Sequence, residues 1–328
     1  MSDNSIKKNQ EEKGDKKKSV FRKIIIAVIL LFLVLAILRV YKIFRDFPAV
    51  KQRDNRINFL FLGISGGEYK PPDLTDTIIF SSYNINTGRM LFLSIPRDIW
   101  LESLKAKVNT AYHYGGFPLV KKAVEEIVGQ PVHYFFVLDF EGFKKVVDIL
   151  GGVNIKVERT FDDFKYPIPG KENDECSGDK EFKCRYEHLH FEAGWEKMNG
   201  ERALKYVRSR NAEGEEGTDA ARAVRQQIFL SSLKNQLLDW KILLSPNKIS
   251  RLINIFSQYV STNLTKEEYP KLILSFLRFN PQEIKQEVLL NVDGLLYHPA
   301  KHYSGQWVLL PKEGNWEKIQ KEISKILP

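Results

Sequence analysis

Asn58–Gly63 reads NFLFLG, Thr77–Tyr83 reads TIIFSSY and Arg89–Ile95 reads RMLFLSI. Short apolar runs of this length, bounded by turn-forming residues, are typical of buried strands. Asn84–Gly88 (NINTG) separates the second run from the third and has the composition of a tight turn. The sequence therefore predicts three strands, of which the last two are joined as a hairpin.

Helical patterns and further strands alternate after these runs. Pro118–Val128 and Phe143–Leu150 have helical periodicity, and His133–Phe140 and Val153–Val157 are strand candidates. The later segments are predicted, in order, as a charged surface excursion (160–192), a segment that is helical or becomes a strand near Tyr206 (Gly200–Val207), an amphipathic helix (Asp219–Trp240), further helices (247–285), short strands (Leu289–Leu310) and a last helix (Asn315–Leu327). This alternation predicts an α/β fold, a layered α-β-α domain with a central mixed sheet.

An apolar run of 15 residues, IIIAVILLFLVLAIL, occupies positions 24–38. The run is short for a membrane span, but apolar residues continue on both sides of it, and Arg22, Lys23 and Arg39 can extend to the two interfaces. Basic residues precede the run, so the positive-inside rule places the N-terminus in the cytoplasm. We expect a single-pass anchor in the lipid bilayer of the cell membrane; a cleaved signal peptide is the alternative.

This orientation divides the chain into a cytoplasmic disordered basic tail (1–20), a transmembrane anchor (21–44), a linker (45–57) and an extracytoplasmic domain (58–328). The net charge is +9, and residues 1–23 hold eight Lys or Arg against four Asp or Glu, which leaves about +5 for the rest. That charge suits an anionic ligand but is too mild to indicate nucleic acid, and the tail is too short and mixed for a DNA-binding module. No nucleic-acid partner is expected.

Cys176 and Cys184 are the two cysteines of the chain. In an exported domain, a disulfide bond that closes this short loop is the simplest expectation. His188 and His190 follow closely, so a zinc site is an alternative, although the cysteine spacing differs from the usual zinc pattern. Free thiols are the third alternative.

Arg97 lies where a ligand is expected. The predicted strand Arg89–Ile95 runs into Pro96, so the chain must turn directly after it. Ligands of open α/β sheets bind beyond the carboxyl ends of strands. A surface salt bridge between Arg97 and Asp98 is the alternative explanation.

Arg208 and Arg210 lie two residues apart in the segment YVRSR. If this segment is extended, both guanidinium groups project from one face. Two neighbouring cations repel each other unless an anion lies between them, so an anion site is one interpretation. A solvated basic strand edge is the other.

Arg222, Arg225 and Gln226 lie in DAARAVRQQ, in the first turns of the helix predicted to start at Asp219. Arg222 and Arg225 share a helix face, and Gln226 lies next to Arg222. Cations are disfavoured near a helix N-terminus, which itself attracts phosphate, so a bound anion would explain the arginines. Arginine also bonds phosphate oxygens in pairs. A basic helix face balanced by three glutamates just upstream is the alternative.

Asp76 lies in LTDT, at the start of a predicted strand. Its carboxylate can pair with an arginine, or it can hold a Mg²⁺ ion that bridges a diphosphate, since Mg²⁺ favours one or two carboxylates plus phosphate oxygens. Both interpretations remain open from the sequence. Gly63–Gly67 (GISGG) matches a hydrolase elbow, but Pro71 and Pro72 prevent the helix which that motif requires.

These motifs occur in a specific order: a first strand that ends in LxG, then TDT, SIPRD, KxNxAY followed by GG, GxxxMNGExALKYVRSR and DxxRxxRQQ. Behind a membrane anchor, this ordered set resembles the LytR-CpsA-Psr family, also called the cell envelope-related transcriptional attenuator domain. The resemblance covers roughly residues 57–240.

The resemblance implies a phosphotransferase that moves a glycopolymer, such as teichoic acid or capsule, from a polyprenyl-diphosphate carrier to peptidoglycan. The residues that match the family's motifs are Arg97, Arg208, Arg210 and Arg222 for the diphosphate, with Gln226 alongside, and Asp76 for Mg²⁺ or another divalent cation. Asp219, in DxxR, is a candidate base or a residue that orients an arginine. We add Arg225 to the substrate-binding set because it shares the helix face of Arg222.

One position departs from the family's pattern. Members often carry LGxD after the first strand, whereas this chain has Ser65 in place of the aspartate, and Asp73 is a candidate replacement. Two other functions remain open: a non-catalytic envelope regulatory or anion-binding protein, and a polyprenyl-diphosphate hydrolase with water as the acceptor.

Overall fold

The computed structural model describes residues 25–26, 28–39, 41–42, 45, 48–67, 71–171, 173–237, 239, 242, 244–289 and 294–328, without the side chains of residues 219, 220 and 246. The chain divides into two compact units. One comprises residues 1–50 and 265–275, and the other comprises residues 51–264 and 276–328.

The smaller unit contains the apolar run. Residues 28–39 are helical and their large apolar side chains are exposed, and α8 (Tyr269–Ser275) also belongs to this unit. Among the residues that the structure describes, no helix has both the length and the apolar character needed to cross a bilayer. The predicted anchor at 21–44 falls partly outside the described residues, at 21–24, 27, 40 and 43–44.

The larger unit is built on a six-stranded sheet with the order β11-β6-β1-β2-β3-β12. Its strands are β1 (Arg56–Ile64), β2 (Thr75–Asn84), β3 (Met90–Ser94), β6 (Tyr134–Asp139), β11 (Val260–Thr262) and β12 (Ile284–Val288). β1 and β6 are parallel, as are β3 and β12, whereas the other neighbours are antiparallel. The predicted α/β fold with a central mixed sheet is therefore confirmed.

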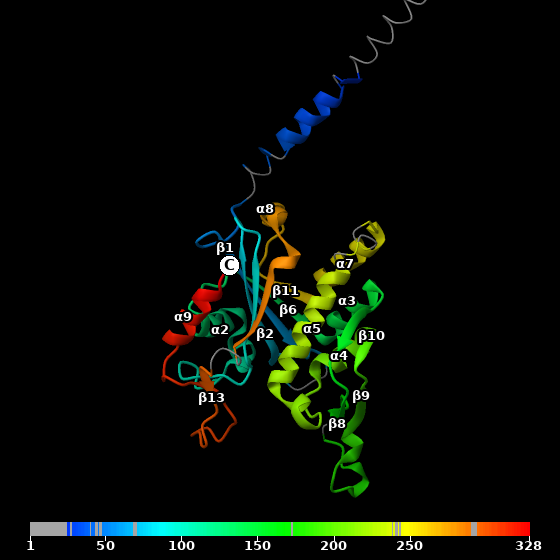
Figure 1. Ribbon diagram of the computed structural model, residues 1–328, viewed down its shortest axis with the longest axis vertical. Coiled ribbons are helices and arrows are strands. Elements are labelled where there is room, and N and C mark those ends of the chain that lie inside the picture. The colour runs from blue at the N-terminus through cyan, green and yellow to red at the C-terminus, as the bar shows by residue number, and fades with distance from the viewer. Residues whose placement is uncertain are drawn as a thin grey trace, which may run out of the picture. The chain divides into compact units, whose positions relative to one another are not determined.

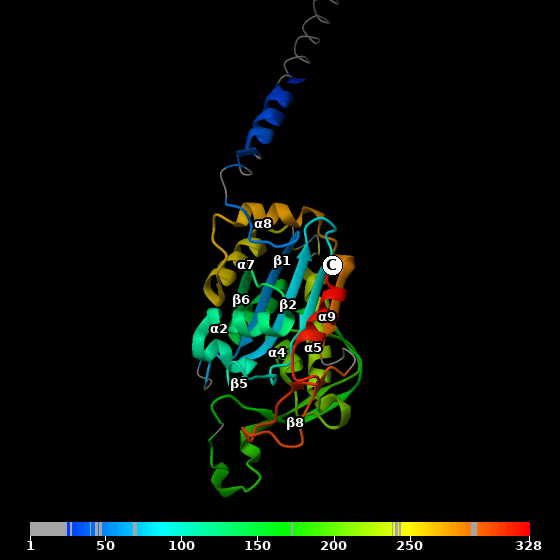
Figure 2. The ribbon, with the colours of Figure 1, turned by 90° about the vertical axis from the view of Figure 1, so that its left-hand side faces the viewer.

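Helices cover both faces of this sheet. They are α2 (Ala111–Val128), α3 (Phe140–Leu150), α4 (Gly200–Arg208), α5 (Asp219–Leu237), α7 (Pro246–Tyr259) and α9 (Glu317–Ile326), with short 3-10 turns η1 (Val108–Thr110), η2 (Cys176–Gly178), η3 (Lys183–Arg185), η4 (Gly214–Gly217), η5 (Phe276–Arg278) and η6 (Pro281–Glu283). α2 and α9 lie on one side of the sheet, and α3, α4, α5 and α7 lie on the other (Figure 1). The view in Figure 2 shows α2 and α9 in front of the strands.

The described residues of this unit also form four pairs of short strands. They are β4 (Trp100–Leu101) with β5 (Ala106–Lys107), β7 (Val153–Val157) with β10 (Gly194–Met198), β8 (Phe161–Pro167) with β9 (Tyr186–Phe191), and β13 (Leu296–Tyr297) with β14 (Leu310–Pro311).

The main core lies between the sheet and α2. Leu60, Phe80 and Leu93 of the sheet are fully buried against Val124 and Ile127 of the helix. Alternate strand residues face this core, whereas helix residues three apart reach it, as the two periodicities require. The rigid sheet that results fixes the positions of the strand ends.

The segment 160–192, predicted as a surface excursion, is only partly at the surface. Phe161 and Tyr166 of β8 and Leu189 and Phe191 of β9 are buried in a second apolar cluster beneath α4 and α5. Charged neighbours hide this alternation in the sequence. The residues between the two strands are mostly exposed and project from the unit in Figure 1.

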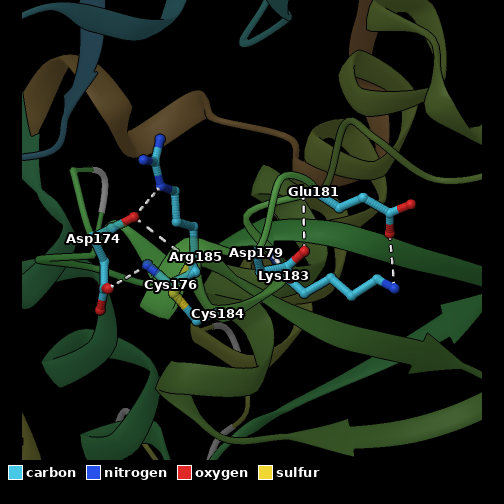
Figure 3. Close-up of a disulfide and its surroundings, with 7 residues drawn as sticks. All are labelled: Asp174, Cys176, Asp179, Glu181, Lys183, Cys184 and Arg185. Carbon is cyan, nitrogen blue, oxygen red and sulfur yellow. Dashed lines mark hydrogen bonds and ion pairs between the residues drawn. A yellow bond between two sulfur atoms is a disulfide. The ribbon is translucent and has the colours of Figure 1, made fainter.

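Cys176 and Cys184 form a disulfide bond in this projection (Figure 3). Arg185 Nε donates a hydrogen bond to Asp174 O at 2.7 Å, which closes the loop beside the disulfide. The expected disulfide is confirmed. Because the bond uses both sulfur atoms, the alternatives of a zinc site and of free thiols are wrong at these cysteines.

The prediction of helices across 247–285 is partly wrong. α7 lies there, but β11 and the start of β12 also fall within this range. These two strands are the outermost strands of the central sheet, one on each side. β12 reads IKQEV, so no apolar run marks it in the sequence. Its parallel pairing with β3, from Ile284 opposite Met90 onward, makes it a strand.

Candidate functional site

The ends of several strands meet at one edge of the central sheet. β1 and β6 end there and β2 begins there, because Ile64 lies opposite both Asp139 and Thr75. β3 and β12 end at the same edge, where Val288 lies opposite Ser94. This edge is the lower end of the sheet in Figure 1. Side chains that leave these strand ends are therefore brought close together.

A pocket lies at this edge, between the strand ends and the first turns of α5. Four of the sequence-predicted site residues line it: Asp76 from β2, Arg97 from the turn after β3, and Arg222 and Gln226 from α5. The motifs TDT, SIPRD and DxxRxxRQQ thus contribute to one pocket.

Arg97 is held by two carboxylates. Its Nη1 donates a hydrogen bond to Asp76 Oδ1, and its Nε lies 3.4 Å from Asp98 Oδ2. Asp98 is fixed in turn by Lys107, whose Nζ lies 2.7 Å from Asp98 Oδ1. The Arg97 side chain is only 19% exposed, so it is a partly buried, oriented cation rather than a loose surface charge.

The KxNxAY motif supports the Arg97 turn. Lys107 braces Asp98, and the backbone N–H of Asn109 donates to Arg97 O at 3.3 Å. Asn109 O accepts from the buried Thr75 hydroxyl at 3.1 Å. The motif therefore ties the start of β2 to the turn after β3. Sequence reasoning missed this role, for which the fixed spacing of the motif was the available signal.

α5 begins beside the pocket. Thr218 caps it, since its Oγ1 accepts from Ala221 N at 3.1 Å. Gln226 Nε2 donates to Thr77 Oγ1 at 3.2 Å and ties the helix to β2. The positive end of the helix dipole thus lies close to Arg222, and together they favour an anion. Asp219 is the first residue of α5, but its side chain lies outside the described residues.

Arg208 ends α4, so the helical alternative for this segment is confirmed, and the extended YVRSR segment that would project Arg208 and Arg210 from one face is not formed. Arg208 Nη1 donates to Tyr166 Oη at 3.0 Å, and its guanidinium lies over the Phe140 ring at 4.0 Å. Phe140 directly follows the last residue of β6, so Arg208 lies at the same sheet edge as the pocket. Arg210 is exposed, and the alternation expected to align it with Arg208 does not exist. Tyr166 and Phe140 were not foreseen as partners of Arg208.

Arg225 is a correction to the predicted substrate-binding set. Its side chain is buried, its Nη1 lies 2.7 Å from Glu216 Oε2, and its Nε and Nη2 donate to the carbonyls of Tyr206 and Ser209. Burial lowers the pKa of Arg225, and the neighbouring Glu216 carboxylate opposes that change. This face of α5 points at the segment after α4 rather than at the sheet edge. Arg225 therefore positions the chain that carries Arg208.

Asp76 is the pocket carboxylate best suited to a divalent cation. The Asp98 carboxylate forms an ion pair with Lys107. The Asp76 side chain is 36% exposed and has Arg97 as its ion-pair partner, so it is the more accessible of the two carboxylates. Ser65, which stands where many family members have an aspartate, donates a hydrogen bond to the Pro72 carbonyl at 3.2 Å and offers no carboxylate. A Mg²⁺ ion that takes its other ligands from water and phosphate fits a single protein carboxylate of this kind.

Asp73, the candidate replacement for the missing aspartate, lies 2.6 Å from Nδ1 of His113 through its Oδ1. Burial, with the Asp73 charge adding to it, raises the pKa of the neighbouring Tyr112. Asp73 is therefore engaged with the start of α2, which leaves Asp76 as the stronger candidate ligand.

Aromatic rings line the face of the sheet that points away from α2. The ring centroids of Phe61 and Phe136 are 5.3 Å apart, and those of Phe61 and Phe92 are 6.0 Å apart. Phe256 of α7 lies 5.8 Å from Phe136. The three sheet rings are half-buried, in contrast with the fully buried side chains that face α2. This face can contact an apolar ligand as well as α7.

The fold and the pocket together define an α/β domain with an arginine-lined pocket at the edge of its central sheet. A model of the LytR_cpsA_psr family matches residues 4–325, and the chain belongs to this family.

Two relatives show how this family is named. The regulatory protein MsrR of Staphylococcus aureus is 27% identical over 267 residues, which cover 76% of this chain and 72% of MsrR. The polyisoprenyl-teichoic acid–peptidoglycan teichoic acid transferase TagV of Bacillus subtilis is 27% identical over 285 residues, which cover 85% of this chain and 66% of TagV. The crystal structure of B. subtilis TagV matches with a TM-score of 0.59 at 25% identity, over 84% of this chain and 98% of that one.

Proposed function

We propose that the chain is a phosphotransferase that moves a glycopolymer from a polyprenyl-diphosphate carrier to peptidoglycan during cell wall assembly. The observation that carries the proposal is the pocket that Arg97, Arg222 and Gln226 line beside Asp76. Two guanidinium groups and an amide suit a diphosphate, because arginine forms paired hydrogen bonds to phosphate oxygens. The name of TagV, a teichoic acid transferase, supports this type of reaction.

In the proposed reaction, a hydroxyl oxygen of a peptidoglycan sugar forms a bond to the sugar-bearing phosphorus. The bond from this phosphorus to the oxygen that bridges the two phosphates breaks, polyprenyl phosphate leaves with the electron pair, and the hydroxyl proton passes to a base. Such transfer depends mainly on positioning and charge neutralisation. Arg97 and Arg222 supply both, Arg208 and Arg210 extend the positive region, and Asp219 is the proposed base or the residue that orients Arg222.

We propose Asp76 as the ligand of Mg²⁺ or another divalent cation, with phosphate oxygens and water as the other ligands. When bound, such an ion withdraws negative charge from the phosphates. Arg97 and the cation would compete for the Asp76 carboxylate, which would leave the Arg97 guanidinium available to the substrate phosphates.

The proposal includes a membrane anchor at residues 21–44 and an extracytoplasmic domain at 58–328, placed outside the cell by the basic residues before the apolar run. The helical conformation and the exposed apolar side chains of residues 28–39 support it. The half-buried rings of Phe61, Phe92 and Phe136 are the proposed contact surface for the polyprenyl chain.

A transfer assay tests the proposal. Full-length protein in detergent is mixed with a lipid-diphosphate-linked glycan, Mg²⁺ and peptidoglycan fragments. Labelled glycan bound covalently to the fragments is the expected result. Glycan phosphate released without an acceptor would instead indicate a hydrolase. Donor binding without turnover would favour a regulatory protein, the second candidate, for which the name of MsrR is the supporting observation.

A further inference from the structure

Three exposed aromatic side chains lie on one short stretch of the chain, which leads into the pocket. Tyr303, Trp307 and Tyr297 are 71%, 47% and 40% exposed, and they lie in β13 and in the loop that joins it to β14. Single exposed apolar side chains are ordinary on protein surfaces, as Trp195 of β10 illustrates, but a group of rings marks a binding surface.

The rings of this loop are held in place by other rings. Trp100 is only 4% exposed and underlies the group, with its ring 4.7 Å from that of His302 and 5.5 Å from that of Tyr303. Nearer β14, His298 stacks on Trp307 at 4.9 Å with their planes 22° apart. Side chains that are already ordered lose little entropy when a ligand binds.

Glu102 supplies the polar part of this surface. Its Oε1 accepts from Trp100 Nε1 and its Oε2 accepts from Tyr303 Oη, each at 3.0 Å. Because each carboxylate oxygen has two lone pairs, the exposed Glu102 can also accept from ligand hydroxyl groups. Between residues 298 and 309 the loop contains one lysine, Lys301, and no arginine, so it offers no strongly cationic groove to a polyanion.

The loop is continuous with the pocket. Trp100 N donates to Leu309 O and Leu309 N donates to Asp98 O, each at 3.0 Å, and both Leu309 and Asp98 line the pocket. Trp307 precedes Leu309 by two residues, so their Cα atoms are at most about 7 Å apart. The β13–β14 loop also lies at the lower end of the sheet in Figure 1, where the strand ends meet.

We propose that Tyr303, Trp307, His298 and Glu102 form an aromatic surface that binds the uncharged, β-linked amino-sugar chain of peptidoglycan. The C–H faces of such pyranose rings are apolar and stack on aromatic rings, and their hydroxyl and acetamido groups hydrogen-bond at the rim. The inference rests on the proposed function and deepens it, because it gives the acceptor a place beside the phosphate pocket. A polyanionic donor glycan is disfavoured there by the charge of Glu102.

Binding of tetra-N-acetylchitotetraose to the full-length protein in detergent tests this inference by isothermal titration, without a donor or turnover. This neutral β-1,4-linked tetramer has the backbone of a peptidoglycan glycan strand. We expect the wild type to bind it and Trp307→Ala to weaken binding about tenfold, which is the loss of one aromatic contact. The matched control, Trp195→Ala, also removes an exposed tryptophan and should leave binding unchanged. Equal melting temperatures of the two variants show that both are folded.

Four outcomes overturn the inference. In the first two, the wild type does not bind the tetramer, or both variants weaken its binding equally. In the other two, Trp307 is needed for binding of poly(glycerol phosphate) instead of the tetramer, or it is needed for dimer formation and Trp307→Ala abolishes the dimer without affecting tetramer binding. The transfer assay separates this test from the proposed function. If glycan transfer occurs but the tetramer does not bind, the proposal of a sugar-binding aromatic surface is rejected and the proposed transferase activity stands. If the tetramer binds in a Trp307-dependent way but no transfer occurs, the sugar-binding surface stands and the proposed transferase activity is rejected.

Discussion

Arg97 contacts two carboxylates whose other partners differ. Asp98 also binds Lys107 and is nearly buried, so it fixes the position of the guanidinium. Asp76 is more exposed and faces the pocket, so its contact with Arg97 can be exchanged for phosphate oxygens or a cation. One arginine is thereby both held and available, which is what charge neutralisation in a preorganised site requires.

Arg97→Ala should lower the rate of glycan transfer about 10²- to 10³-fold, the usual effect of removing a group that stabilises transition-state charge. The measurement is the initial rate of transfer at saturating donor. Arg89→Ala removes an exposed arginine that is paired with Glu283 at 2.6 Å and serves as the matched control. Equal rates for the two variants would contradict the assignment of Arg97 to the site.

Arg225→Met should lower stability rather than contact with the ligand. Removal of one partner from a buried ion pair costs about 3–5 kcal/mol, because Glu216 would keep only the exposed Arg159, at 4.0 Å. Urea unfolding measures this loss. Arg210→Met, at an exposed position, should change the free energy of unfolding by less than about 0.5 kcal/mol. Similar losses in both variants would contradict the structural role of Arg225.

The sequence predicts Arg97, Arg222, Gln226 and Asp76 because each stands at a strand end or a helix start. It fails for Arg225, because spacing on one helix does not reveal which neighbouring segment each side of that helix meets. The partner of Arg225 is the chain after α4, whose path depends on the second apolar cluster.

The β2–β3 hairpin depends on Gly88, which adopts a φ of 75°. A Cβ atom added there would lie 1.8 Å from the carbonyl oxygen of Arg278, so the turn packs directly on the chain before β12. Gly67 also has a positive φ but has nothing within 4 Å of the same position. An alanine at Gly67 would therefore meet backbone strain alone, whereas an alanine at Gly88 would meet the same strain and a steric clash.

Gly67→Ala should cost about 1–2 kcal/mol, the strain of a left-handed alanine, and Gly88→Ala should cost clearly more because backbone must also move. Thermal unfolding of both variants measures the difference. Equal melting temperatures would show that the contact between the hairpin and Arg278 is absent.

His133 links β6 to β1, since its Nδ1 accepts from Asn58 N at 2.9 Å. Burial, assisted by the charges of Lys121 and Lys51, lowers the pKa of His133 to about 4. The unfolded chain therefore takes up this proton at a higher pH than the folded protein, and stability falls as the pH drops from about 6.5 toward 4.

Because of the lowered pKa of His133, the free energy of unfolding should be about 2 kcal/mol smaller at pH 4.5 than at pH 7.5, with partial solvent screening included. Urea unfolding at both pH values should show a smaller loss for His133→Gln than for the wild type. His190 has the opposite sign, because hydrogen bonds to Asp162 and Glu192 raise its pKa, so its contribution disappears as the pH rises above about 6.5. If His133→Gln lost as much stability as the wild type between pH 7.5 and pH 4.5, the assignment of this pH dependence to His133 would be contradicted.

Apolar runs and turn residues were enough to predict β1, β2, β3 and β6. They were not enough for β12, whose polar sequence becomes a strand only through pairing with β3, or for the last turn of α4, which continues through Arg208. Local pattern predicts elements that bury their own apolar side chains, and it misses those that are defined by a distant partner.

The molecule as a whole brings distant motifs together through its sheet order. β3 pairs with β2 in a hairpin, whereas β12 follows almost 200 residues after β3 and lies directly beside it. α5 packs on β12, so Arg222 and Arg97 reach the same pocket. The layered α/β class could be predicted from the alternation of elements, but the sheet order could not, since it depends on pairings of high sequence separation.

The central claim is that Arg97 and Arg222, from separate parts of the chain, bind one diphosphate next to Asp76. A crystal structure of the full-length protein with a short polyprenyl diphosphate and Mg²⁺ tests this most directly. We predict density for the two phosphates between the Arg97 and Arg222 guanidinium groups, with the cation at Asp76. Diphosphate bound elsewhere on the protein, with these two arginines in contact with carboxylates alone, would contradict the account.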